Sequence, residues 1–194
     1  MQGFEWLFVL YILHLLSLKN IGLTTMGNNM AIKRAMYEKI GGYEKIPFSV
    51  TEDFALFHVV KNSGGRFINA FSADILAKTP AIPSTNEWFR QRKRWLRGAW
   101  KGGFVAILGS FVFSFLEWII LFSTLLFSPY FLLLFMVYYF FLVFGAKKVN
   151  DKLAQKKLKT KHIIWYPFYH AFYYPLLLLL ATFSRKVNWK GRNF

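Results

Sequence analysis

The chain has 194 residues, of which 55% are apolar and 21% aromatic while only 18% are charged, whereas globular domains have roughly 45–50% apolar and about 25% charged residues. This composition excludes an ordinary soluble domain, and the lack of cysteine excludes disulfides, a thiolate nucleophile and cysteine metal sites. A formal net charge of +16 points to an anionic partner, either lipid headgroups, phosphate or nucleic acid.

The first apolar run extends from Phe4 to Leu18 and contains one acidic residue, Glu5. At about 1.5 Å per residue, a helix of this length falls short of a hydrocarbon core of about 30 Å. The run also lacks the basic start and the small-residue cleavage site of a signal peptide. We therefore expect a buried or interfacial helix here.

Residues 19 to 101 have mixed polarity and frequent turn residues, which indicates a soluble part. A short helix is expected from Met30 to Ile40, where Gly41-Gly42 would form a left-handed C-cap. A second helix opens after Thr51, a candidate N-cap, and should end about three turns later at Ser63-Gly64-Gly65.

Two short strands are expected next, from Arg66 to Phe71 and from Asp74 to Thr79. The segment from Ser84 to Glu87 then matches a capping box, in which a hydroxyl and a carboxylate cap the first turn. This signature predicts a helix from Glu87 to Trp100.

Two membrane spans are predicted between Gly102 and Ala146, because the only formally charged residue in this stretch is Glu117 and one span takes about 20 residues. Ser128-Pro129 marks the turn between them. These spans make nucleic acid a poor explanation for the basic charge. Glu117 would either line an acceptor or polymer passage or pair with another helix.

The segment from Lys147 to Lys161 is rich in lysine, which places it on the cytoplasmic side by the positive-inside rule. A third apolar stretch follows from Ile163 to Ser184, interrupted by Pro167 and Pro175. A full crossing would translocate the basic tail, so a re-entrant or interfacial segment is favoured, with a plain crossing as the alternative.

Thr51-Glu52-Asp53 is the first motif that could carry chemistry. Acidic residues in a first helical turn are common for a structural reason, since they interact favourably with the free amides and the helix dipole. The functional interpretation makes Asp53 a general base, which must lie within hydrogen-bond reach of the hydroxyl that it deprotonates.

The second motif is Gln-Arg-Lys-Arg-Trp at residues 91–95. On a helix Gln91, Arg94 and Trp95 share one face, where a guanidinium could bind phosphate and an indole could stack on a sugar ring. The structural alternative is a juxtamembrane basic helix that contacts anionic lipid.

The two motifs together, directly before membrane spans, resemble the membrane-bound family-2 glycosyltransferases. This group contains cellulose, hyaluronan and chitin synthases and ceramide glucosyltransferase-like enzymes. Further matches lie at Gly27-Asn28-Asn29-Met30-Ala31 with Arg34, at Ile40-Gly41-Gly42-Tyr43, and at residues 187–192. The resemblance spans essentially the whole chain.

The resemblance implies an α/β fold, a partial GT-A-type domain followed by transmembrane α-helices. It implies inverting transfer from a nucleotide-sugar donor to a lipid or glycan acceptor. Asp53 would be the base and Glu52 would shape the acceptor site. Arg94, with Gln91, would bind the donor diphosphate, and Trp95 would stack near the acceptor.

Enzymes of this group carry an Asp-x-Asp that binds a divalent metal, Mg or Mn, and no such motif occurs in this sequence. The expectation is therefore that the metal ligands lie outside this chain, in a missing N-terminal nucleotide-binding half, and that the chain alone is inactive. His14, His58, His162 and His170 show no metal-ligand spacing, and structural or interfacial roles are expected for them.

The predicted organisation has four parts: residues 1–101, the C-terminal half of the catalytic domain with its interfacial helix; 102–146, a transmembrane hairpin; 147–162, a basic cytoplasmic loop; and 163–194, a third membrane segment with a basic tail. The predicted location is a multi-pass protein of the cytoplasmic or inner membrane with a cytosolic catalytic part and no nucleic-acid partner. Two alternatives stay open, a processive polysaccharide synthase and a non-enzymatic membrane protein whose basic helix binds anionic lipid or a partner subunit.

Overall fold

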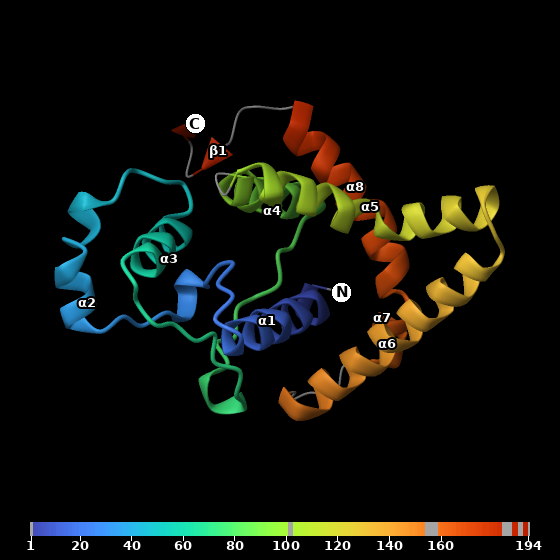
Figure 1. Ribbon diagram of the computed structural model, residues 1–194, viewed down its shortest axis with the longest axis horizontal. Helices are drawn as coiled ribbons and strands as arrows, with labels where there is room; N and C mark the ends of the chain where they lie inside the picture. The colour runs from blue at the N-terminus through green and yellow to red at the C-terminus, as the bar shows by residue number, and fades with distance from the viewer. Residues whose placement is uncertain (1, 101–102, 154–158, 184–187, 190–191, 194) are drawn as a thin grey trace. The chain divides into compact units, whose positions relative to one another are not determined.

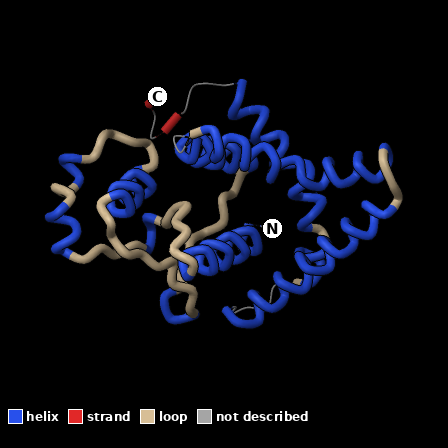
Figure 2. Tube along the Cα trace, in the orientation of Figure 1, coloured by secondary structure: helices blue, strands red, loops and turns tan. Residues whose placement is uncertain are grey.

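The computed structural model describes residues 2–100, 103–153, 159–183, 188–189 and 192–193. Most of these residues lie in helices (Figures 1 and 2). Two compact units are formed, unit 1 from Met1–Phe8 and Ala81–Phe194, and unit 2 from Val9–Pro80. Helix α1 (Gln2–Leu18) contributes its first residues to unit 1 and the rest to unit 2.

Unit 2 contains two further α-helices, α2 (Arg34–Lys39) and α3 (Glu52–Asn62). Three single-turn helices accompany them, η1 (Gly27–Asn29) before α2, η2 (Tyr43–Lys45) between α2 and α3, and η3 (Ala73–Ile75) after α3. Buried apolar side chains of this unit come from α1 and α3, namely Leu13, Leu56 and Phe57.

The ends of α2 and α3 follow local signals. Gly41 and Gly42 have φ angles of 77° and 67°, the left-handed conformation predicted for a C-cap, and α3 gives way to Ser63 and Gly64 as expected. Helix α2 begins at Arg34 instead of Met30, because the chain before it is extended after η1. Thr51 takes the N-cap position of α3 without capping it, since its hydroxyl bonds to Ser49 Oγ at 3.2 Å.

The predicted α/β catalytic fold is wrong for the described part of the chain. Residues 66–72 and 76–79 are not paired as strands, and the only sheet described is the antiparallel pair of β1 (Asn188–Trp189) and β2 (Arg192–Asn193). The physical reason is visible at Asn69. Its carbonyl oxygen lies 2.7 Å from His14 Nδ1 and its amide donates to Ser17 Oγ, so side chains of α1 satisfy backbone groups that a neighbouring strand would otherwise take.

Unit 1 is built from five helices that follow one another closely: α4 (Thr85–Ala99), α5 (Phe104–Leu126), α6 (Tyr130–Leu153), α7 (Thr160–Ile164) and α8 (Tyr166–Phe183). Ser84 Oγ accepts the amide of Glu87 at 3.2 Å, which confirms the predicted cap of α4. A buried aromatic and aliphatic cluster joins the start of α1 to α7 and α8 through Phe4, Ile163 and Tyr166.

Helices α5 and α6 form a hairpin, with Ser128 and Pro129 in the turn between them (Figure 1). The stretches Ile107–Leu126 and Tyr130–Asp151 are long and apolar enough to cross a membrane, and few of their side chains are buried inside the protein. The second helix continues to Leu153, so the first seven residues of the predicted basic loop, 147–153, are helical. Residues 154–158 of that loop lie outside the described residues.

Helix α8 contains Pro175 in its interior without ending there. Proline has no amide hydrogen, so the carbonyl of Ala171, one turn earlier, loses its usual partner within the helix. The indole Nε1 of Trp118 in α5 donates to this carbonyl at 2.7 Å. A hydrogen bond between helices thus replaces the one that proline removes.

Candidate functional site

Asp53 lies in the first turn of α3, partly buried, with both carboxylate oxygens engaged. Oδ2 accepts the amide of Gly27 at 2.9 Å and Oδ1 accepts the amide of Phe54 at 2.8 Å. Gly27 is required at this distance, because a Cβ there would lie 2.9 Å from the Cβ of Asp53. The glycine thus brings η1 against the carboxylate.

Tyr43 is also close to the acidic pair. Partial burial raises the pKa of Tyr43, and the negative charges of Glu52 and, less strongly, Tyr37 and Asp53 raise it further. Its amide donates to the hydroxyl of Tyr37 at 3.1 Å. Glu52 itself is exposed.

Three motifs that carried the predicted resemblance therefore gather within unit 2. The segment at Gly27 bonds directly to Asp53, and the segment ending in Tyr43 lies within electrostatic reach of Glu52 and Asp53. The sequence assigns no site role to Gly27 or Tyr43, although both lie in segments that match the family pattern. A carboxylate fixed by two backbone amides with an exposed carboxylate beside it can act as a positioned base.

The other predicted residues lie on α4 in unit 1. Gln91, Arg94 and Trp95 are all partly buried. The ring of Trp95 meets the ring of Trp6 edge to face, with centroids 5.1 Å apart. The ring of Trp95 is therefore in contact with the N-terminal helix.

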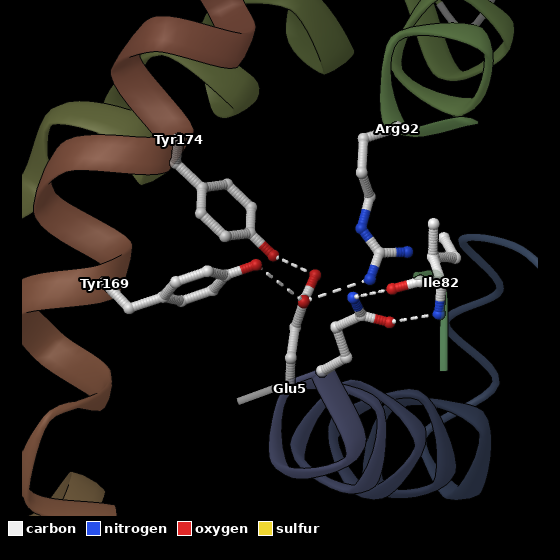
Figure 3. Close-up of polar contacts among 6 residues, drawn as sticks. Glu5, Ile82, Arg92, Tyr169 and Tyr174 are labelled. Carbon is white, nitrogen blue, oxygen red and sulfur yellow. Dashed lines mark hydrogen bonds and ion pairs between the residues drawn. The ribbon is translucent and has the colours of Figure 1, made fainter. Parts of the chain in front are cut away.

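The sequence predicts no site role for Arg92, which is the buried residue of the motif at residues 91–95. Its Nη2 lies 3.0 Å from Oε2 of Glu5, and the two side chains are only 6% and 4% exposed. The hydroxyls of Tyr169 and Tyr174 in α8 donate to the same carboxylate (Figure 3). The sequence signal that could have identified Glu5 as a buried partner is its position as an acidic residue within an apolar run.

A hollow of about 380 Å³ lies within unit 1. Gln2 and Ile82 both line it, and the side-chain amide of Gln2 pairs with both backbone groups of Ile82. Three aromatic rings from α4 and α8 contribute to its walls, those of Trp88, Tyr169 and Tyr173. The hollow is small and mainly apolar, with hydroxyl groups from Ser84 and Thr85.

Glu117 in α5 is buried and has partners on two other helices. Its Oε1 lies 2.8 Å from His170 Nδ1 and accepts the hydroxyl of Tyr138 at 3.1 Å. Of the two roles predicted for Glu117, pairing with another helix is therefore observed. His170 takes the structural role expected for the histidines.

No group of three or more His, Asp or Glu side chains that could hold a metal ion occurs among the described residues. The residues described thus do not fit the divalent metal implied by the predicted family. The convergence of Asp53 with Arg94 and Trp95 stays a prediction, because the former belongs to unit 2 and the latter two to unit 1.

Comparison with known families gives one result: the model of glycosyl transferase family 21 matches residues 14–194. No curated protein and no solved structure matches the chain. The match confirms the predicted resemblance at the level of a glycosyltransferase family. It does not extend to the cellulose and hyaluronan synthases named with it.

Proposed function

The chain belongs to glycosyl transferase family 21, and we propose that it transfers a sugar, with inversion, from a nucleotide-sugar donor to a lipid-linked or membrane-proximal acceptor. The observation that carries this proposal is the fixed carboxylate of Asp53. Two backbone amides hold it, and the neighbouring motif segments at Gly27 and Tyr43 lie around it.

In this mechanism the acceptor hydroxyl attacks the anomeric carbon of the donor from the face opposite the leaving group. Asp53 takes the hydroxyl proton as the new carbon–oxygen bond forms and the bond to the diphosphate breaks. The backbone bonds to Gly27 and Phe54 hold the carboxylate, which lowers the cost of orienting it for proton transfer. Glu52, exposed beside it, contacts the acceptor.

The leaving diphosphate gains negative charge as the bond breaks, and cationic donors stabilise that charge. We assign this role to Arg94, with Gln91 as a hydrogen-bonding neighbour one turn before it on α4. Trp95 presents an aromatic face to the acceptor.

The membrane location of the acceptor is supported by the two apolar helices that follow α4 directly. Lysines at the end of α6 and at the start of α7 favour the cytosolic side for the catalytic part, in a multi-pass protein of the cytoplasmic membrane. An acceptor that sits in the same membrane reaches the site without leaving the lipid.

The test is glycosyl transfer from a labelled nucleotide sugar in membranes that contain the chain. Asp53→Asn should lower the rate of transfer about 100-fold or more. It should leave donor affinity nearly unchanged, because the base acts on the acceptor. Retained turnover would refute the assignment of Asp53.

Arg94→Ala serves as the complementary variant. It should weaken the binding of nucleoside diphosphate, measured by competition against labelled donor. Unchanged affinity, together with weaker binding to vesicles of anionic lipid, would instead favour the alternative in which the basic helix contacts lipid.

A further inference from the structure

The carboxylate of Glu5 receives three donors from two other helices. Arg92 Nη2 of α4 lies 3.0 Å away, the Tyr169 hydroxyl 3.3 Å and the Tyr174 hydroxyl 2.5 Å. Both tyrosines belong to α8 (Figure 3). All of these groups lie within unit 1, and the carboxylate is almost fully removed from solvent.

The guanidinium of Arg92 also lies over three tryptophan rings. Its central carbon is 4.7 Å from the ring centroid of Trp95, 4.9 Å from that of Trp6 and 5.4 Å from that of Trp88. These are cation–π distances. Trp95 therefore has two aromatic or cationic neighbours inside the protein, Arg92 and Trp6.

The guanidinium of Arg92 is held by ring contacts as well as by its hydrogen bond to Glu5. A buried ion pair costs desolvation free energy that its attraction repays only with good geometry and further hydrogen bonds. Here Arg92 meets Glu5 through one nitrogen, and its Nε is buried without a hydrogen-bond partner among the described residues. The feature that arginine adds over other side chains at this place is a flat cation that stacks on indole faces.

We propose that Arg92, anchored by Glu5, is a positioning residue that fixes the ring of Trp95 for the acceptor. The inference rests on the proposed function for the role of Trp95 and on geometry for the rest. Arg92 touches neither donor nor acceptor in this scheme. Glu5, Tyr169 and Tyr174 hold its guanidinium, and the guanidinium holds the indole.

Two variants separate positioning from folding. Arg92→Lys keeps a cation for Glu5 and loses the flat stacking surface. The pair Glu5→Leu with Arg92→Met removes both charges, so neither is left buried without its partner. Arg66→Lys, on an exposed arginine of unit 2, is the matched control for the same chemical change.

The readouts are near-ultraviolet circular dichroism of the full chain in detergent, and the KM for acceptor against the affinity for nucleoside diphosphate. Both Arg92 variants should keep the helical signal in the far ultraviolet and lose intensity from the Trp6 and Trp95 rings. The KM for acceptor should rise about tenfold while nucleotide affinity stays unchanged. The Arg66→Lys control should match the parent chain in every measurement.

Retention of both the tryptophan signal and the acceptor KM in Arg92→Lys would overturn the proposal. An equal loss of acceptor and nucleotide binding, together with a lowered unfolding temperature, would also overturn it, because that pattern indicates a purely structural pair. If the parent chain shows no glycosyl transfer under any condition, the proposed function fails by itself. The tryptophan signal then still decides whether Arg92 positions Trp95.

Discussion

Gly27→Ala is the sharpest test of how the carboxylate of Asp53 is held. A Cβ at position 27 would lie 2.9 Å from the Cβ of Asp53 and 3.0 Å from its Oδ2. Ordinary contacts of this kind begin at 3.4 Å, so the two segments must separate by about 0.5 Å (3.4 − 2.9). A shift of that size lengthens the amide–carboxylate bond from 2.9 Å to about 3.4 Å, beyond useful hydrogen-bond distance.

The cost follows from the loss of one hydrogen bond to a charged group. The expected loss of stability is about 1.5 kcal/mol, the lower end of the range for such bonds, because this hydrogen bond is exposed to solvent. A loss of this size should raise the population of local opening at the start of α3 about tenfold.

Hydrogen exchange followed by mass spectrometry measures this opening directly in peptides that cover the first turns of α3. Gly3→Ala is the control, since a Cβ at Gly3 meets nothing within 4 Å. Exchange in Gly27→Ala within about twofold of the parent chain would show that η1 moves aside freely. The amide of Gly27 would then not be what holds Asp53.

Two further predictions concern titratable groups elsewhere. Glu117→Leu and His170→Phe each leave a buried partner behind, so each should lower stability in detergent by about 3–5 kcal/mol, and the double variant should cost clearly less than their sum; additive losses would show that the two side chains do not interact. Burial, and then the charge of Lys61, lower the pKa of His58, so the fold favours its neutral form. Unit 2 should therefore keep full stability above the usual value of 6.5 and lose stability as the pH falls below it, which thermal unfolding can follow. His58→Phe should remove this loss, and an unchanged pH profile would contradict the assignment.

Local signals predicted the ends of helices well. Ser84 caps α4 through its hydroxyl, and Gly41 and Gly42 adopt left-handed angles after α2, because each of these effects depends on groups within a few residues. The sequence also identified Asp53 and Gly27 within motifs. Their hydrogen bond could not be predicted, because it joins segments 26 positions apart.

Long-range pairing could not be predicted in the same way. The sequence predicts a strand from Arg66 to Phe71, yet the backbone of Asn69 bonds to side chains of α1. Likewise Glu5 and Arg92 lie 87 positions apart, and nothing in a single sequence couples an acid in an apolar run to one arginine among several. The helical spacing on α4 selected Arg94 as the site residue and left out Arg92, the buried cation two residues earlier.

The indole of Trp118 that bonds to the Ala171 carbonyl has a mechanical consequence. Sliding α5 along α8 by one turn would separate the Trp118 indole from the Ala171 carbonyl and leave that oxygen without its donor. This single hydrogen bond therefore opposes a change of register between the two helices.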